Sequence, residues 1–305
     1  MWKSLRHGLS YALVKLLMWL GGALPRSCAL RLFSTLGALA FYLLPKARVT
    51  TEVNLSVAMP ELSRPELRKT ARRVWSDLGR NCVDVLRFPR SGWDELDKLV
   101  RVEGLAILEE AVSRGRGTIA VTGHIGNWEM LGAYFSMRGY PLSVLARPLR
   151  DARFERLLDR QRRGKGMRPI SRIANARPVY ESLKRGDILG VLIDQDTPVK
   201  GVFCEFFGRP AFTPAGPAYL AMRTGAAVVP MAISMQSDGT HLVRILKPID
   251  ASAKDGDDKD RRALEITREC TRSLEKLIRY EPTQWVWMHE RWKTRPEQQQ
   301  SKVVE

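Results

Sequence analysis

The chain has 305 residues, of which 44% are hydrophobic, so it holds enough apolar material for one large folded domain or two smaller ones. Its formal net charge of +17 implies an anionic partner, such as a membrane surface, a phosphorylated substrate or an acidic protein. The four cysteines lie far apart and form no Cys-x-x-Cys pair, which argues against a zinc module or a disulfide scaffold and fits a reducing compartment.

The first 48 residues contain two apolar segments, at 9–24 and 28–44. Lys15 interrupts the first and Arg31 the second, so neither is a clean run of about 20 apolar residues, the usual spanning length. No small-residue cleavage site of the signal-peptide type follows them. We interpret residues 1–48 as a hydrophobic membrane anchor that spans the bilayer or lies in its interface. The alternative is a pair of core helices packed on the domain.

Beyond this segment, helix and strand patterns alternate along the chain. A long amphipathic helix begins near Ser63, whose spacing to Glu66 is that of a capping box. Further helices are expected at 105–112, 151–163, 178–184, 214–223 and 261–279. Apolar strands are expected at 118–121, 142–146, 188–193, 227–233 and 241–246. This alternation predicts an α/β fold with a sheet buried on both faces.

The first of these strands leads into the segment TGHIGNWE, residues 122–129. A histidine at a strand end, with a carboxylate five residues later, suits a general base, because the carboxylate fixes the tautomer and stabilises the imidazolium. Residues five apart on a helix point about 140° away from each other. His124 and Glu129 can therefore meet only if His124 lies on the turn before the helix. The alternative is a buried structural histidine at a helix start.

Candidate functional residues follow other strands as well, and ligands of open α/β sheets bind beyond the carboxyl ends of strands. His124, Arg147 and Asp194 each fall at such an end. Arg147 opens a basic stretch reaching Arg177, and arginine suits bidentate binding of phosphate. Nucleic acid is not expected as a partner, because the stretch lacks interleaved aromatic residues. Asp194-Gln195-Asp196 could hold a metal with a sugar nucleotide, orient a substrate group or cap the next turn.

Two aromatic segments lie in the second half of the chain. Residues 202–214 carry four phenylalanines in a stretch that reads as loop-rich, and these either line an acyl-chain pocket or belong to the core. Residues 284–296 are dense in tryptophan and either rim the active site or face a membrane interface. His289, in this second segment, is expected to be structural.

Together these motifs resemble the bacterial lipid A biosynthesis acyltransferase family, of the lauroyl/myristoyl transferase type. The resemblance rests on the hydrophobic N-terminus, residues 123–129, Arg147-Pro148, Asp194-Gln195-Asp196 and residues 287–296. It implies an α/β fold like that of glycerolipid acyltransferases, with a mixed sheet flanked by helices and an N-terminal hydrophobic helical anchor. We accordingly divide the chain into the anchor at 1–48, an acyltransferase domain at 49–296 and a disordered tail at 297–305.

The resemblance also implies an activity. The expected enzyme is bound to the cytoplasmic side of the inner membrane. It moves a fatty acyl group from acyl carrier protein, or coenzyme A, to a hydroxyl of a lipid A precursor or related glycolipid. A basic surface suits all three expected partners, namely acidic acyl carrier protein, a phosphorylated glycolipid and an anionic membrane surface. No metal or other cofactor is expected.

The expected mechanism is direct transfer without a covalent enzyme intermediate. His124 removes the proton from the acceptor hydroxyl, while Glu129 orients His124 and stabilises its charged form. Backbone amides of residues 126–127 steady the oxyanion, and Arg147 holds phosphate or the developing charge. The residues expected to bind substrate are Asn127, Arg147, Asp194 and Gln195.

Three alternatives remain open. The same superfamily includes phosphatidylinositol mannoside acyltransferases, which would change the acceptor and keep the chemistry. A metal-dependent glycosyltransferase would use Asp194 and Asp196. A non-catalytic membrane-associated binding protein would use its basic face to recruit an acidic partner.

Overall fold

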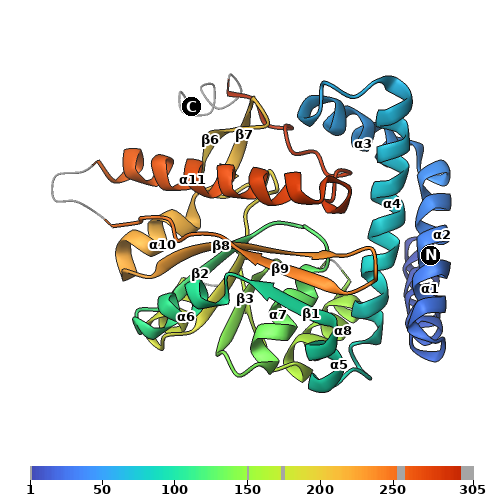
Figure 1. Ribbon diagram of the computed structural model, residues 1–305, viewed down its shortest axis with the longest axis horizontal. Coiled ribbons are helices and arrows are strands. Elements are labelled where there is room, and N and C mark those ends of the chain that lie inside the picture. The colour runs from blue at the N-terminus through green and yellow to red at the C-terminus, as the bar shows by residue number, and fades with distance from the viewer. Residues whose placement is uncertain (1, 150, 173–175, 253–257, 297–305) are drawn as a thin grey trace.

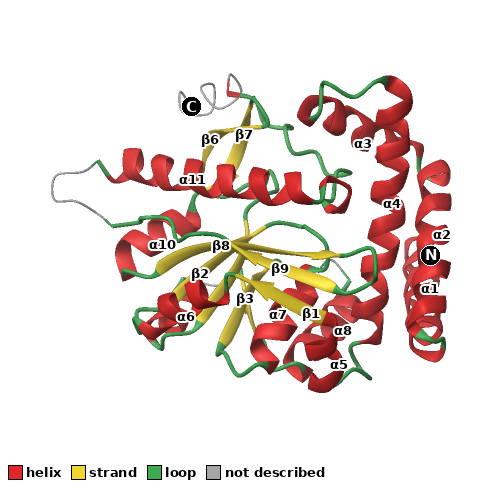
Figure 2. Ribbon diagram, viewed as in Figure 1, coloured by secondary structure: helices red, strands yellow, loops and turns green. Residues whose placement is uncertain are grey.

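The computed structural model describes residues 2–149, 151–172, 176–252 and 258–296. The expected disordered tail at 297–305 lies outside the described residues. A seven-stranded sheet forms the centre of the molecule, helices cover both of its faces, and four N-terminal helices pack at one end (Figure 1). Figure 2 separates these helices from the strands by colour.

The central sheet is mixed, as expected, with strand order β1-β9-β8-β2-β5-β3-β4. The five strands from β8 to β4 are parallel to one another, whereas β9 pairs antiparallel with β8 and parallel with the edge strand β1. All residues of β2 are buried, as a central strand covered on both faces requires. The strands are β1 Val100–Glu103, β2 Thr118–Thr122, β3 Leu142–Ala146, β4 Arg168–Ser171, β5 Ile188–Leu192, β8 Ala227–Met235 and β9 His241–Ile245.

Two hydrophobic clusters lie on opposite faces of the sheet, because successive side chains of a strand point to opposite sides. Ile119 and Val121 belong to the cluster with α9, α10 and α11, whereas Ala120 belongs to the cluster with α5, α6 and α7. The helices of the sheet domain, with the short 3-10 helix η1, are α5 Trp93–Leu99, α6 Leu105–Ser113, α7 Trp128–Met137, α8 Ala152–Gly164, α9 Arg177–Lys184, α10 Gly216–Thr224, α11 Lys259–Tyr280 and η1 Pro282–Gln284.

The N-terminal helices are α1 Trp2–Ala23, α2 Arg26–Leu43, α3 Pro45–Ala58 and α4 Arg64–Arg87. The capping box expected at the start of α4 is present.

Helices α2 and α4 meet at backbone contact. A Cβ atom on Gly37 would lie 2.1 Å from the carbonyl oxygen of Trp75, and one on Gly79 would lie 2.1 Å from that of Phe33. Glycine at both positions therefore permits the close approach.

The outer sides of α1, α2 and α3 carry exposed apolar side chains. On α2 they recur with helical spacing, at Leu32, Leu36, Leu39 and Leu43. No single helix among the described residues is both long and apolar enough to cross a membrane. The pair α2 and α3 meets that test together, but the two helices are bent by 96° where they join.

The segment expected to be loop-rich forms a separate antiparallel hairpin of β6 Gly201–Phe206 and β7 Arg209–Pro214. Its two turn residues, Phe207 and Gly208, have φ values of 50° and 73°. These left-handed conformations suit a tight hairpin turn, for which a phenylalanine gives no sequence signal. The helix expected from residue 214 begins only at residue 216, because β7 occupies the chain up to Pro214.

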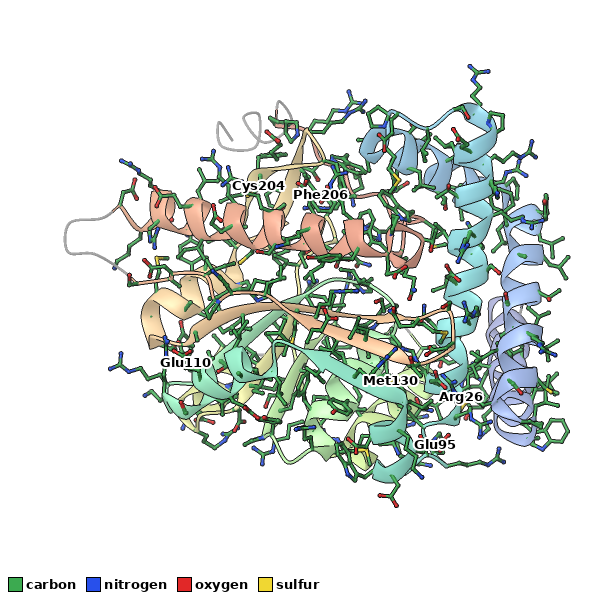
Figure 3. The ribbon with its side chains drawn as sticks, in the orientation of Figure 1. Arg26, Glu95, Glu110, Met130, Cys204 and Phe206 are labelled. Atoms are coloured by element: carbon green, nitrogen blue, oxygen red, sulfur yellow. The ribbon has the colours of Figure 1, made fainter. Side chains whose placement is uncertain are left out.

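Three of the four phenylalanines of this hairpin, Phe206, Phe207 and Phe212, are buried in the core, and Phe203 is half-buried. Phe206, labelled in Figure 3, is fully buried. Its ring centroid lies 5.4 Å from that of Trp285 and 5.8 Å from that of Trp292. Of the two interpretations of this aromatic segment, the structure supports the core.

Candidate active site

His124 lies on the turn between β2 and α7, as expected. The Asn127 side chain caps α7, because its Oδ1 accepts a hydrogen bond of 3.0 Å from the Met130 N–H. Gly126 has a φ of +56°, and a Cβ atom there would lie 2.1 Å from the carbonyl oxygen of Ile233. The turn therefore requires glycine at this position and holds His124 at the carboxyl edge of the sheet.

The partner of the His124 ring is Asp194. Thr122 and Leu192 are opposite each other in the parallel pair β2–β5, so both site residues follow two positions beyond the last paired residues. Nδ1 of His124 lies 2.9 Å from Oδ1 of Asp194, and the His124 backbone N–H donates to Oδ2 at 2.6 Å. Trp285 Nε1 also donates to Oδ2, at 2.8 Å. With Nδ1 as the donor, the basic nitrogen of His124 is Nε2.

Glu129 does not orient His124, and this part of the predicted mechanism is wrong. Its carboxylate accepts two hydrogen bonds from Arg162, at 2.9 Å from Nε and 2.5 Å from Nη2. The physical reason is that Glu129 lies in the first turn of α7 and faces α8, which carries Arg162. This bidentate pair joins the two helices at the wall of the cavity described below.

Electrostatics favour the protonated form of His124. Burial of the ring lowers its pKa. The charge of Asp194 and the hydrogen bond between Asp194 and His124 raise this pKa by more, and the charge of Glu129 raises it further. The pKa of His124 therefore lies above its ordinary value of 6.5. Burial raises the pKa of Asp194, but the His124 charge and hydrogen bonds outweigh it, so this pKa is well below the usual range.

A cavity of about 650 Å³ begins at His124 and extends beneath α8 and the ends of β3 and β5. Its inner wall is apolar and includes Val144, Leu145, Leu158, Met167 and Val191. Besides His124, the charged and polar side chains at the cavity are Glu129, Arg147, Arg162, Arg172, Gln195, Thr197 and Lys200.

Four of the predicted site residues, His124, Glu129, Arg147 and Gln195, thus line one cavity. Gln195 Nε2 lies 3.5 Å from His124 Nε2 and marks the side on which the ring meets the cavity. Asp194 is 1% exposed and lies behind the His124 ring, so it positions His124 instead of contacting a ligand.

Asn127 and the Gly126 amide do not take the roles expected of them. Asn127 is 3% exposed, and besides capping α7 it donates from Nδ2 to the carbonyl oxygen of Asn81. Its side chain is therefore structural and does not bind substrate. The Gly126 N–H donates to the carbonyl oxygen of Gln284 at 2.8 Å, so it is not free for an oxyanion.

Asp196 fastens the C-terminal segment, because Thr294 donates to it from the backbone N–H at 2.7 Å and from Oγ1 at 3.0 Å. Asp194 and Asp196 thus serve different protein groups. The described residues contain no cluster of three or more His, Cys, Asp or Glu side chains arranged to hold a metal ion.

The tryptophan-rich segment packs behind His124 and Asp194 and does not form the edge of the cavity. Trp285 and Trp287 are buried, and the His289 ring lies 4.7 Å from that of Trp285 and 6.3 Å from that of His124. Burial, together with the nearby charges of His124 and Arg291, lowers the pKa of His289 to about 4. A second cavity, of about 590 Å³, lies between His289 and the bend that joins α2 to α3.

Sequence reasoning missed the contacts made by Asp194, Trp285 and Arg162. The Asp194 contact follows from the register of β2 against β5, which a strand pairing could have revealed. No comparable sequence signal identifies Arg162 or Trp285, because their partners are distant along the chain.

The mixed α/β sheet thus carries a histidine–aspartate pair at the mouth of an apolar-lined cavity, an arrangement of the kind that general-base enzymes use. The model of the family described as bacterial lipid A biosynthesis acyltransferase matches residues 2–294. The chain belongs to this family.

Two groups of relatives are similar to it. The lipid A biosynthesis lauroyltransferase of Escherichia coli K12 is 27% identical over 289 residues, covering 92% of this chain and 90% of its own. The phosphatidylinositol mannoside acyltransferase of Mycobacterium tuberculosis H37Rv is 32% identical over 162 residues. That second match covers half of each protein. The corresponding Mycolicibacterium smegmatis enzyme is 28% identical over 176 residues, or 56% of this chain and 58% of its own.

Proposed function

We propose that this protein transfers a fatty acyl group from a thioester of acyl carrier protein, or of coenzyme A, to a hydroxyl of a lipid A precursor or related glycolipid. The observation that carries the proposal is the pairing of His124 Nδ1 with Asp194 at the mouth of an apolar-lined cavity. Relatives named for lipid A acyl transfer, similar over nine-tenths of the chain, support this acceptor class.

In the proposed reaction the acyl group passes directly from the thioester to the acceptor, without a covalent enzyme intermediate. Nε2 of His124 takes the proton of the acceptor hydroxyl as its oxygen attacks the thioester carbonyl carbon. The tetrahedral intermediate collapses with cleavage of the carbon–sulfur bond, and the imidazolium returns the proton to the departing thiolate. Asp194 holds the ring and stabilises its charged form during the step.

The walls of the cavity fit the two substrates. The apolar side chains from β3, β5 and α8 would take the acyl chain, in place of the hairpin phenylalanines. Arg147 is exposed at the cavity and lies near Arg172. The pKa of Arg172 is lowered, first by its own burial and second by the charge of Arg147. Two neighbouring arginines suit a phosphorylated glycolipid or an acidic carrier protein.

The proposed location is the cytoplasmic face of the inner membrane. The exposed apolar sides of α1, α2 and α3 would lie in the membrane interface, which needs no spanning helix. This placement would also bring the cavity beside His289, which lies next to the α2–α3 bend, to the membrane surface.

The test is acyl transfer in detergent, from labelled acyl carrier protein and coenzyme A thioesters to a panel of glycolipids. Wild type is compared with the pair Asp194→Asn and Asp196→Asn, which remove the same charge at neighbouring positions. Label transferred to a lipid A precursor by wild type and Asp196→Asn, but hardly by Asp194→Asn, supports the proposal. Folded wild-type protein that transfers no label to any acceptor refutes it.

A phosphatidylinositol mannoside acceptor is the second candidate, because the M. tuberculosis enzyme is 32% identical over half of this chain. Label appearing on a mannosylated phosphoinositide, with none on the lipid A precursor, would select it. The chemistry at His124 would be unchanged.

A further inference from the structure

A third cavity, of about 350 Å³, lies between α2 and α4 and is lined by basic side chains. It shares no lining residue with the cavity at His124. Its basic side chains come from positions 69, 72, 73 and 80 of α4, a spacing that places them along one side of the helix. Ser34 of α2 and Ser76 of α4 also line the cavity, and their hydroxyl groups are hydrogen-bonded to each other at 2.7 Å.

The charges in this cavity are strongly unbalanced. Among its lining residues Asp77 is the one carboxylate, against four basic side chains, those of Lys69, Arg72, Arg73 and Arg80. The side chain of Asp77 is 8% exposed and already accepts a hydrogen bond of 2.6 Å from Thr283 Oγ1. It also lies 3.5 Å from Arg80 and 3.7 Å from Arg73.

The remaining two cations, Lys69 and Arg72, have no ion-pair partner in the part of the chain that the structure describes. Both are exposed. Exposed cations that line one cavity without a carboxylate partner are a binding arrangement for a phosphate group, whose oxygens accept several charge-assisted hydrogen bonds.

The position of the cavity indicates where that phosphate comes from. An interfacial helix buries its apolar face about 5–10 Å into the boundary between headgroups and acyl chains. The leucine stripe of α2 faces outward, and α4 packs directly behind α2 at backbone contact. Because a helix is about 10 Å across, the basic side chains of α4 would then lie at the level of the lipid phosphates.

We propose that this cavity binds the phosphate of an anionic membrane lipid and so fixes the orientation of the protein on the bilayer. The inference rests on the proposed interfacial placement of α1 and α2, but not on acyl transfer itself. It assigns to Lys69, Arg72, Arg73 and Arg80 a role in docking that is separate from the chemistry at His124.

The test measures binding to vesicles of phosphatidylcholine alone and of phosphatidylcholine mixed with phosphatidylglycerol. The site variant is Lys69→Gln/Arg72→Gln. The control is Lys259→Gln/Arg268→Gln, which has the same net charge and lies in the first half of α11, a helix whose N-terminal end is on the side of the molecule away from α2 (Figure 1). Thermal unfolding and acyl transfer in detergent show that each variant is folded.

The expected result is that wild type and control prefer the mixed vesicles, and that the site variant binds them about thirty-fold more weakly. That loss corresponds to about 1 kcal/mol for each basic side chain removed near an anionic surface. Binding to phosphatidylcholine alone stays unchanged in all three proteins.

Four other results would overturn the inference. An equal loss of binding to the mixed vesicles in the site variant and the control would show that only the net charge of the protein matters. Equal binding of all proteins to both vesicles would remove the phosphate site and leave the interfacial placement intact. Wild type that binds neither vesicle would remove both, while the detergent assay still reports on acyl transfer. Saturable binding of inorganic phosphate, lost only in the site variant without any change on vesicles, would assign the cavity to a soluble anion.

Discussion

Two histidine–aspartate pairs of nearly the same geometry lie in different surroundings. His124 Nδ1 is 2.9 Å from Asp194, and His241 Nε2 is 2.8 Å from Asp84. The side chain of His124 is 23% exposed at a cavity, whereas that of His241 is fully buried.

The second pair also has a third member. Arg26, labelled in Figure 3, donates to both carboxylate oxygens of Asp84 at 2.7 and 2.8 Å, and to the carbonyl oxygen of Gly239 at 2.7 Å. The cluster thereby joins α2 and α4 to the β8–β9 connection. The comparison teaches that an aspartate partner alone does not make a general base. The difference is a ring nitrogen that faces a space where substrate can bind.

The largest expected effect separates the two histidines. His124→Ala should lower the rate of acyl transfer by about 10²–10⁴-fold, the usual contribution of a general base. The free energy of unfolding should fall as well, because the variant leaves the buried Asp194 carboxylate without its His124 partner, so the rate is compared per folded molecule. Single-turnover transfer and thermal melts measure the two quantities. Near-normal turnover of the folded variant would remove His124 from the mechanism.

The next effect tests Asp194 as the group that positions His124. Asp194→Asn should lower the rate by about 10²-fold or more, because an amide can favour the wrong tautomer of the ring. Glu129→Gln should lower it less, since Glu129 is bonded to Arg162 and acts on His124 only through charge. If Glu129→Gln were the more damaging change in a folded protein, the predicted partner of His124 would be wrong.

The buried pair should affect stability. The Arg26 hydrogen bonds, together with His241, outweigh the effect of burial and lower the pKa of Asp84 to about 2, against an ordinary 3.8. A carboxylate with a depressed pKa stabilises the fold above its ordinary pKa, and this stabilisation is lost as the pH falls through 2.

Asp84→Asn should therefore reduce the free energy of unfolding at pH 7 by about 2 kcal/mol. Urea unfolding between pH 7 and pH 2 should show a smaller acid-induced loss for the variant than for wild type. Transfer per folded molecule should stay at the wild-type rate. An identical pH dependence of stability in both proteins would contradict the assignment.

The smallest effect is a shift in the pH profile. Because the pKa of His124 is raised and the neutral ring is the base, kcat/KM should fall as the pH drops, with a midpoint above 6.5. Glu129→Gln should move this midpoint to lower pH by removing one of the charges that raise it. A midpoint that stays fixed would mean that another group controls the profile.

Most strands of the central sheet could be predicted from the sequence, because they are continuous apolar runs. The bounds of β3 match the expectation, and those of β2 and β5 differ by one residue. Strand β4 was missed, since Arg168 and Ser171 at its ends are exposed and no apolar run marks it. The β6–β7 hairpin was missed because Phe207 gives no turn signal.

The sequence also predicted residues that line one cavity, but not their contacts. The strand pattern places His124 and Asp194 each at a strand end, whereas closeness along the chain favours Glu129 as the partner of His124. Strand register, which decides that Asp194 meets His124, depends on long-range pairing. Asn127 shows the same limit, because its capping role is visible only once the start of α7 is known.

The glycine contact between α2 and α4 has a practical consequence. Gly37 and Gly79 allow the backbones of α2 and α4 to come into contact, so α2 is an integral part of the folded domain. Arg26 at its start also holds Asp84 of the buried cluster. A shortened protein prepared for crystallisation or screening should therefore keep α2. Removing it would uncover the apolar side of α4 and strip Asp84 of its strongest partner.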